Sequence, residues 1–465
     1  MQNQERSKML GTMPMRALVP KISVPVMMSM LVQALYNVVD SIFVARFSPT
    51  GLTAVSLAYP IQMLMIALST GMGVGISSLI SRRLGEKSSD QARLAAWNGL
   101  AILVCGSLLF TVLGLFFAPA CMRLTVSDNL AGAEEIRQLG TTYLSIVCTF
   151  SLGLFMAIQF ERMLQSTGNT ILAMATQMAG AVTNIILDPI MIFGLLGCPS
   201  LGVAGAAIAT VIGQFVSAIL GLVLNQKKNP ELILHVREFH LNLQLIRLIL
   251  AVGFPSTIMQ AISSVMNIGM NAILSGYAEG NAAVNVLNVY FKLQSCIFMP
   301  VFGLSTGLIA IVGYNFGARD RQRVYDAIKV ALLYALVIML IGTLIFWTIP
   351  GPLMSLFESD ADAVVTAAMS RIGVHALNII SLSFLAAAVG IILSSVYQAV
   401  GKGLYSLIMS VCRQLLVLLP VAFLISRLSP DVAQIWWCFP ISEVVSCVIC
   451  LLLYRKLDRT MLATL

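Results

Sequence analysis

The chain has 465 residues, of which 58% are hydrophobic and only 10% are charged, and its formal net charge at pH 7 is +8. Soluble domains carry about 25% charged residues, so this composition excludes an ordinary soluble enzyme and indicates a polytopic membrane protein. The basic residues lie in short loops between apolar segments, which argues against a nucleic-acid partner and for a role in membrane topology.

Apolar segments follow one another along almost the whole chain, each near or above the roughly 20 residues that a helix needs to cross a bilayer. The sequence therefore predicts an all-α polytopic membrane protein with about twelve transmembrane helices in the lipid bilayer. The expected spans are 17–45, 52–82, 91–117, 136–162, 169–196, 203–226, 244–276, 283–315, 323–349, 363–399, 403–427 and 433–455.

Lysine and arginine fix the expected orientation, because cytoplasmic loops carry an excess of both. With the N-terminus inside, roughly 22 of these residues fall in inside segments and roughly 6 in outside segments. We therefore expect both termini to be cytoplasmic.

The chain repeats itself at a spacing of about 230 residues, which is the signature of internal duplication. Six spans per repeat is an even number, so the two halves are expected to be parallel repeats. The matched positions are Gly71 with Gly303, Gly75 with Gly307, Gly85 with Gly317, Pro25 with Pro255, and Asn37 with Asn267. The expected organisation is an N-terminal six-helix lobe (1–226), a cytoplasmic linker (227–242) and a C-terminal six-helix lobe (243–465).

Two aspartates, Asp40 and Asp188, lie deep in apolar segments. An acidic residue inside a bilayer costs roughly 2.5–3.5 kcal/mol on insertion scales, so such residues usually face a protein interior and serve transport. Burial and a neighbouring carboxylate both disfavour the charged form of a carboxyl group, which suits a pair of acids to bind and release a proton.

Polar residues at helical spacing accompany these acids, since positions i, i+3, i+4 and i+7 share one face of a helix. These faces comprise Gln33, Tyr36, Asn37 and Asp40 in the first span, Gln177, Asn184 and Asp188 in the fifth, and Thr210 and Gln214 in the sixth. The alternative is that these groups only satisfy one another's hydrogen bonds in a packed bundle.

Seven motifs in a fixed order resemble those of bacterial multidrug and toxic compound extrusion (MATE) transporters, over essentially the whole chain. They are VDSIFVARF, SRRLGEK, QSTGNT, NIILDPIMIFG, LGVAGAAIAT, GYNFGARD and YQAVGKG. The resemblance implies two six-helix lobes around a central cavity, alternating access, and export of cationic or amphiphilic compounds by antiport with protons or sodium ions. It also implies residence in the bacterial inner (plasma) membrane.

In that family an acid of the first span joins an Asn and an Asp of the fifth and a Thr of the sixth. The resemblance therefore assigns ion coupling to Asp40, Asn184, Asp188 and Thr210. The paired carboxylates favour protons over sodium. The expected substrate cavity comprises Gln33, Tyr36, Asn37, Gln177, Gln214, Gln260, Asn267 and Glu443, and Pro25 is the expected hinge. Some relatives carry a sodium site of acids in the second lobe, and this sequence shows no counterpart of it.

Three further titratable residues keep two interpretations each. Glu161 either pairs with Arg162 or binds cations, Glu443 is either structural or lines the cavity, and His375 is either packed or interfacial. The nine cysteines predict no disulfide framework, and Cys447-Val-Ile-Cys450 has no partner ligands, so no metal site is expected.

The sequence thus predicts a secondary active transporter without enzyme activity or cofactor, acting as a monomer on small cationic or amphiphilic molecules. A lipid-linked substrate flippase or an exporter of an endogenous metabolite on the same fold is the alternative. Major facilitator transporters also have two six-helix halves, but the segment SRRLGEKSSD lacks their signature after the second span. No nucleotide-binding loop or H-E-x-x-H motif supports a membrane enzyme.

Overall fold

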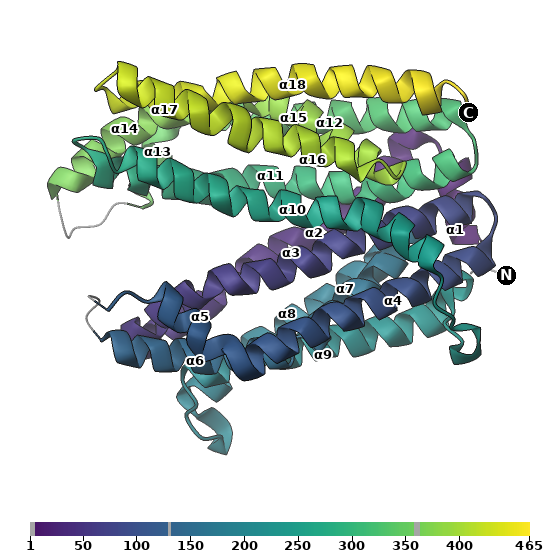
Figure 1. Cartoon of the computed structure of the whole chain (residues 1–465), viewed down its shortest axis with the longest axis horizontal. Helices are drawn as coiled ribbons and strands as arrows, with labels where there is room; N and C mark the ends of the chain where they lie inside the picture. Colours follow the sequence, from purple (N-terminus) through teal and green to yellow (C-terminus); the bar gives the residue numbers. More distant parts are fainter. Residues whose placement is uncertain (1–4, 129–131, 358–362) are drawn as a thin grey trace. The chain divides into compact units, whose positions relative to one another are not determined.

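The computed structural model describes residues 5–128, 132–357 and 363–465, and all regular elements in these ranges are helices. Ten described helices are long and apolar enough to cross a membrane, and two bent helix pairs raise the number of candidate spans to twelve. The predicted all-α membrane architecture is confirmed (Figure 1).

The helices of the first repeat follow the expected spans closely. After a short N-terminal helix, α1 (Glu5–Thr12), they are α2 (Met15–Phe47), α3 (Pro49–Gly85), α4 (Ser89–Val112), a π-helical segment (Leu113–Phe117), α5 (Ala118–Thr125), α6 (Ala133–Thr149), α7 (Leu152–Ser166), α8 (Thr170–Phe193) and α9 (Val203–Lys228). One 3-10 turn, Leu195–Gly197, lies between α8 and α9, and two more, Pro230–Leu232 and Val236–Glu238, follow α9.

The second repeat has the same order of long helices. They are α10 (Leu243–Leu274), α11 (Gly280–Gly317), α12 (Arg321–Thr348), α13 (Pro350–Ser355), α14 (Ala363–Ser381), α15 (Phe384–Ala399), α16 (Gly403–Val411), a π-helical segment (Cys412–Leu418), α17 (Leu419–Leu428), a 3-10 turn (Val432–Trp437), α18 (Cys438–Leu457) and a π-helical segment (Asp458–Leu462).

Each repeat contains one broken span that the sequence predicts as continuous. The helix axis bends by 45° between α6 and α7 and by 51° between α14 and α15. At each break a threonine on a neighbouring helix binds a freed backbone carbonyl: Thr111 Oγ1 donates to the Thr149 oxygen at 3.0 Å, and Thr343 Oγ1 to the Ser381 oxygen at 3.1 Å. A helix can break inside a bilayer only where such partners satisfy its backbone.

By its contacts the chain divides into two compact units. Unit 1 comprises Met28–Thr257 with the described residues before Pro14, and unit 2 comprises Pro14–Met27 with Ile258–Leu465. The division therefore falls inside α2 and inside α10, at equivalent positions two residues after Pro25 and Pro255. The predicted lobe boundary in the linker stays a prediction about the sequence repeat, and Pro25 stays a proposed hinge.

Glycines explain the packing of α10 in unit 1. A methyl group on Gly75 of α3 would lie 2.3 Å from the Ile249 carbonyl oxygen, and one on Gly71 would lie 2.3 Å from Thr257 Oγ1. The backbones of α3 and the first part of α10 are therefore in direct contact, as small residues permit between membrane helices.

The equivalent glycines of α11 make the equivalent contact in unit 2. A methyl group on Gly303 would lie 2.7 Å from the Met27 Cα atom, and one on Gly307 would lie 2.7 Å from Ser23 Oγ. The doubled glycines of the sequence thus mark one repeated contact: the first part of each repeat's first helix packs against the second helix of the other repeat.

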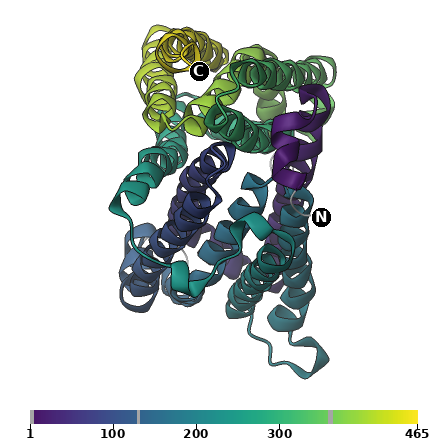
Figure 2. The same ribbon diagram turned by 90° about the vertical axis from the view of Figure 1, so that its right-hand side faces the viewer.

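The remaining helices of each unit pack along one another (Figures 1 and 2). In unit 1, α7 contacts α3, α4, α8 and α9, and in unit 2, α15 contacts α11, α12, α16 and α18. Both interiors bury aromatic side chains, Tyr143 and Phe155 in unit 1 and Tyr290, Tyr397 and Trp436 in unit 2. Small residues dominate where α8 meets α9.

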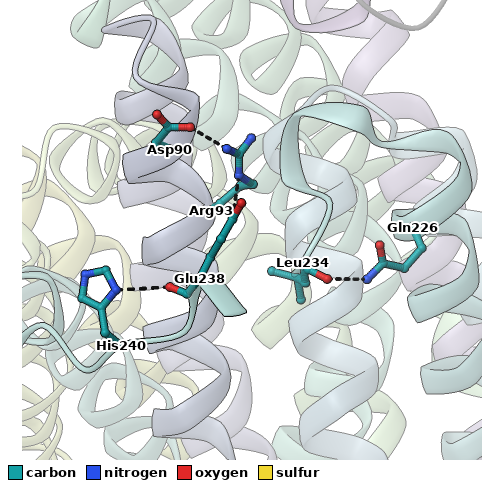
Figure 3. A network of polar contacts seen from close by, with 6 residues as sticks. All are labelled: Asp90, Arg93, Gln226, Leu234, Glu238 and His240. Atoms are coloured by element: carbon teal, nitrogen blue, oxygen red, sulfur yellow. Dashed lines mark hydrogen bonds and ion pairs between the residues drawn. The ribbon is translucent and has the colours of Figure 1, made fainter. Parts of the chain in front are cut away.

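Polar contacts hold the linker against α4 and α9 within unit 1 (Figure 3). Arg93 pairs with Asp90 and, at 3.0 Å, with Glu238, and Gln226 Nε2 donates to the Leu234 carbonyl oxygen at 3.1 Å. His240 Nδ1 lies 3.2 Å from the Glu238 carbonyl oxygen. The second half of the linker is therefore attached to the first repeat.

Asn98 of α4 is fully buried and makes two further hydrogen bonds to the linker. Its Nδ2 donates to the His240 carbonyl oxygen at 3.2 Å, and its Oδ1 accepts from the Asn242 backbone N–H at 2.8 Å. We expect Asn98→Ala to cost about 1–3 kcal/mol locally and to speed hydrogen exchange at Asn242 by roughly tenfold or more. Asp90→Ala, which removes an exposed ion-pair partner of the same network, should change exchange little; equal exchange in the two variants would contradict the assignment.

Candidate functional site

Four helices of unit 1 enclose a cavity of about 80 Å³, which we call cavity 1. Its walls come from α7 and from the faces of α2, α8 and α9 on which helical spacing places polar residues. The lining residues are Gln33, Tyr36, Leu154, Ala157, Ile158, Glu161, Gln177, Gly180, Ala181, Asn184, Thr210, Gly213, Gln214 and Ser217.

Amides and one acid line one part of cavity 1. Gln177 Nε2 donates to Gln33 Oε1 at 2.9 Å, which joins α8 to α2. Glu161 Oε1 accepts from Gln165 Nε2 at 2.7 Å, and Gln165 Oε1 in turn accepts from Arg162 at 2.8 Å. Glu161 therefore reaches Arg162 through an amide, and its carboxylate is part of the cavity wall.

Asn184 joins cavity 1 to the buried acids. Its Nδ2 donates to Asp188 Oδ1 at 3.2 Å, one turn along α8, and contacts Thr210 Oγ1 on α9 at 3.4 Å. Asp188 has no exposed surface, and Asp40 on α2 acts on it electrostatically. The structure thus brings the four residues predicted for ion coupling into one region of unit 1.

Two glycines make this approach of α8 and α9 possible. A methyl group on Gly180 would lie 2.8 Å from the Gly213 carbonyl oxygen, and one on Gly213 would lie 2.7 Å from the Gly180 carbonyl oxygen. Because neither residue has a Cβ atom, the two backbones touch, and Asn184 comes within reach of Thr210.

Three oxygens of this network are buried and have no hydrogen-bond donor in the described part of the chain: Asp40 Oδ1, Asn184 Oδ1 and Asp188 Oδ2. Buried polar atoms are normally satisfied, so this cluster needs a proton, water or a cation. A protonated carboxyl group supplies a donor where the ionised group only accepts. The described residues contain no group of three His, Cys, Asp or Glu side chains that could hold a metal ion.

The other predicted residues lie elsewhere. Asn37 and Gln260 are exposed and lie outside the lining of cavity 1, and His375 is exposed on α14. Asn267 and Glu443 line a separate cavity of about 360 Å³ within unit 2, which we call cavity 2. Pro25 lies inside α2, which continues as a helix through it.

The sequence interpretation missed Arg413, which it counted among the basic residues of the inside segments. In the structure Arg413 lies inside the span Gly403–Leu428, lines cavity 2 and pairs with Glu443 at 3.2 Å. Its position ten residues into an apolar segment is the signal that could have identified it, because an intramembrane charge normally has a named partner.

Comparison with known proteins agrees with this architecture. The MatE family model matches the chain twice, over residues 25–190 and 255–424, once in each repeat. The multidrug export protein MepA of Staphylococcus saprophyticus is 25% identical over 438 residues, covering 94% of this chain and 93% of that protein. MepA of Staphylococcus aureus strain MSSA476 is 25% identical over 442 residues, with coverage of 94% and 93%.

Solved structures show the same fold. A multidrug resistance MATE family transporter of the MOP superfamily in an outward-facing conformation superposes with a TM-score of 0.88 at 25% identity, covering 98% of each chain. A MATE crystal structure in the bent conformation gives a TM-score of 0.89 at 24% identity, covering 99% of each chain. The two matches of the family model together cover more than half of the chain, and we conclude that this multi-pass membrane protein belongs to the MatE family of transporters.

Proposed function

We propose that the protein exports cationic, amphiphilic compounds across the bacterial plasma membrane by antiport with protons. The observation that carries this proposal is the buried cluster of Asp40, Asn184 and Asp188, with three oxygens that lack donors in the described structure. The similarity to MepA, which is named a multidrug export protein, supports the substrate class.

Asn184 links the proton site to the cavity, since it lines cavity 1 and donates to Asp188. When the two aspartates are protonated, they give an organic cation in cavity 1 no electrostatic attraction. When they are ionised, a cation in cavity 1 offsets their charge in a medium of low dielectric constant, where such interactions are strong. Protons and cations therefore compete through charge, and this competition is the coupling that an antiporter requires.

The size of cavity 1 limits what it holds. Pockets for drug-sized molecules measure roughly 300–1,000 Å³, whereas cavity 1 measures about 80 Å³. We infer that it takes the cationic group of a substrate beside Glu161 and the amides of Gln33 and Gln177, and that the apolar part of the substrate binds elsewhere. Pro25 is the proposed hinge for alternating access, and both termini are proposed to be cytoplasmic.

Sodium is the second candidate for the driving ion, because the same oxygens favour it. Hard cations prefer oxygen ligands, and Asp40, Asn184, Asp188 and Thr210 offer carboxylate, amide and hydroxyl oxygens. Two ionised carboxylates would then remain charged throughout the cycle. Protons are favoured because a protonated carboxyl group supplies a hydrogen-bond donor to these unsatisfied oxygens. A sodium ion would need a complete shell of oxygen ligands.

The function is tested by uptake of tetraphenylphosphonium into inside-out vesicles, driven in turn by a proton gradient and by a sodium gradient. We expect the proton gradient alone to drive uptake. Uptake driven only by the sodium gradient would show that sodium is the coupling ion. If folded protein took up no cation under either gradient, the flippase or metabolite-export alternative would be favoured.

Glu161→Gln should lower the affinity for tetraphenylphosphonium by roughly tenfold, since it removes the acid that lines cavity 1 and keeps an oxygen for Gln165. Equilibrium binding of the labelled cation to purified protein measures this change. Glu279→Gln, which removes an acid of unit 2 that pairs with Arg371, is the control and should bind like wild type. Equal affinities in the two variants would remove Glu161 from the proposed site.

A further inference from the structure

Cavity 1 and cavity 2 occupy equivalent places in the two repeats. Residues of cavity 1 have counterparts about 230 positions later that line cavity 2. The corresponding pairs are Gln33 with Ser263, Tyr36 with Met266, Ile158 with Ile391, Gly180 with Arg413, Ala181 with Gln414, Thr210 with Phe439, and Gln214 with Glu443. The two repeats therefore have cavities at equivalent places that differ in size and chemistry, and residues of α11 also line cavity 2.

The difference is largest where the last two long helices of each repeat meet. In unit 1, Gly180 lets α8 and α9 touch, whereas in unit 2 the same place holds the long side chain of Arg413. Arg413 lies in the π-helical segment Cys412–Leu418, and such segments are frequent at functional sites. Cavity 2 measures about 360 Å³, against about 80 Å³ for cavity 1.

The ion pair in cavity 2 leaves hydrogen-bonding groups of both Arg413 and Glu443 without a partner in the described structure. Arg413 and Glu443 are joined by one contact of 3.2 Å, with exposed side-chain fractions of 23% and 14%. Glu443 Oε2 is buried and has no donor among the described residues, and this contact uses one of the five N–H groups of the guanidinium. A buried pair recovers its desolvation cost only when its remaining donors and acceptors are satisfied.

The rest of the wall of cavity 2 indicates what kind of ligand could bind the remaining donors and acceptors of this ion pair. Five aromatic rings line it, together with Met266 and Met299 and the amides of Asn267, Gln294 and Gln414. The rings are Tyr290, Phe291, Phe298, Phe302 and Phe439. Tyr290 and Phe439 pack edge to face with centroids 5.7 Å apart, which leaves a firm apolar surface for another ring.

We propose that cavity 2 is a second binding site, selective for zwitterionic aromatic compounds. The carboxylate of the ligand binds the free N–H groups of Arg413, its ammonium group binds the carboxylate of Glu443, and its ring lies on the aromatic wall. The volume of about 360 Å³ suits a ligand of this size. The site goes beyond the proposed export of cations, because it lies in unit 2 and uses neither Asp40 nor Asp188.

The test is equilibrium binding of Nε-dansyl-L-lysine to the purified full chain in detergent, followed by the fluorescence of the dansyl group. This probe carries an ammonium group, a carboxylate and an aromatic ring. Its methyl ester lacks the negative charge and its Nα-acetyl derivative lacks the positive charge. We expect each derivative to bind roughly tenfold or more weakly than the zwitterion, because each loses one charge-assisted contact. A derivative that binds as well as the zwitterion would overturn the proposal without any mutation.

The variant Arg413→Gln/Glu443→Gln removes both charges at once, so that neither is left unpaired in the interior. We expect its affinity for the zwitterion to fall by roughly tenfold or more, and its residual affinity no longer to distinguish the zwitterion from its ester. Arg371→Gln/Glu279→Gln removes an exposed ion pair of the same unit and should bind like wild type. Unchanged binding in the first variant, or no binding to folded wild-type protein, would make the ion pair a purely structural contact.

Discussion

Asp188→Asn should abolish ion-driven export while leaving the amount of folded protein near wild type. The carboxyl group is fully buried and accepts a hydrogen bond from Asn184 through Oδ1. An amide keeps an oxygen for that bond and removes the cost of burying a charge, but it cannot bind or release a proton. Export of a fluorescent cation from proteoliposomes after a pH jump measures the effect, and we expect it to fall to the rate of empty liposomes.

Asp40→Asn should behave in the same way, because its Oδ1, like Asp188 Oδ2, is a buried carboxylate oxygen without a donor in the described structure. Asp90→Asn is the matched control: it makes the same chemical change at an acid whose side chain is 90% exposed, and it should export normally. Near wild-type export by both Asp188→Asn and Asp40→Asn would refute the assignment and move the search to Glu161 and Glu443.

Gly75→Ala should be among the most destabilising single-methyl changes in the chain. The added methyl group would lie 2.3 Å from the Ile249 carbonyl oxygen and 2.9 Å from the Gly253 backbone nitrogen, so the backbones of α3 and α10 must separate. Overpacking of this kind costs about 1–3 kcal/mol, and here no flexible side chain is available to move aside. Thermal unfolding of the detergent-solubilised protein measures the loss.

Gly351→Ala is the matched control, because the same methyl group would meet nothing within 4 Å there. We expect its stability to equal or slightly exceed that of wild type. Gly307→Ala should lie between the two, since its methyl group would meet the flexible Ser23 hydroxyl at 2.7 Å. If Gly75→Ala unfolded at the same temperature as Gly351→Ala, the contact between α3 and α10 would be wrong.

The spans, the repeat and the polar helix faces could be predicted because they depend on local patterns. Bilayer thickness sets the length of an apolar span, and helical spacing places Gln33 and Tyr36 on one face. Those faces line cavity 1 together with Gln177 and Asn184. The assignment of roles to these residues stays a prediction.

Long-range contacts could not be predicted in the same way. The sequence matched Gly75 to Gly307, but it gave no sign that each contacts the first helix of the opposite repeat. The bends in the fourth and tenth spans have no proline at the break that would have indicated them in the sequence. They depend on threonines of neighbouring helices, which satisfy the freed carbonyls. The sequence interpretation counts Arg413 with the basic residues of the inside segments although it lies in the expected span 403–427, and its partner Glu443 is 30 positions later in the chain.

Movement of the coupling ion itself tests the central claim most directly. Proteoliposomes that hold a trapped pH indicator, in sodium-free buffer, would receive tetraphenylphosphonium on the outside. The account predicts that inward movement of the cation drives protons out and raises the internal pH with wild-type protein, and that a variant carrying both Asp40→Asn and Asp188→Asn gives no change. A wild-type protein that moves the cation without any change in internal pH, or a pH rise that persists in the double variant, would contradict it.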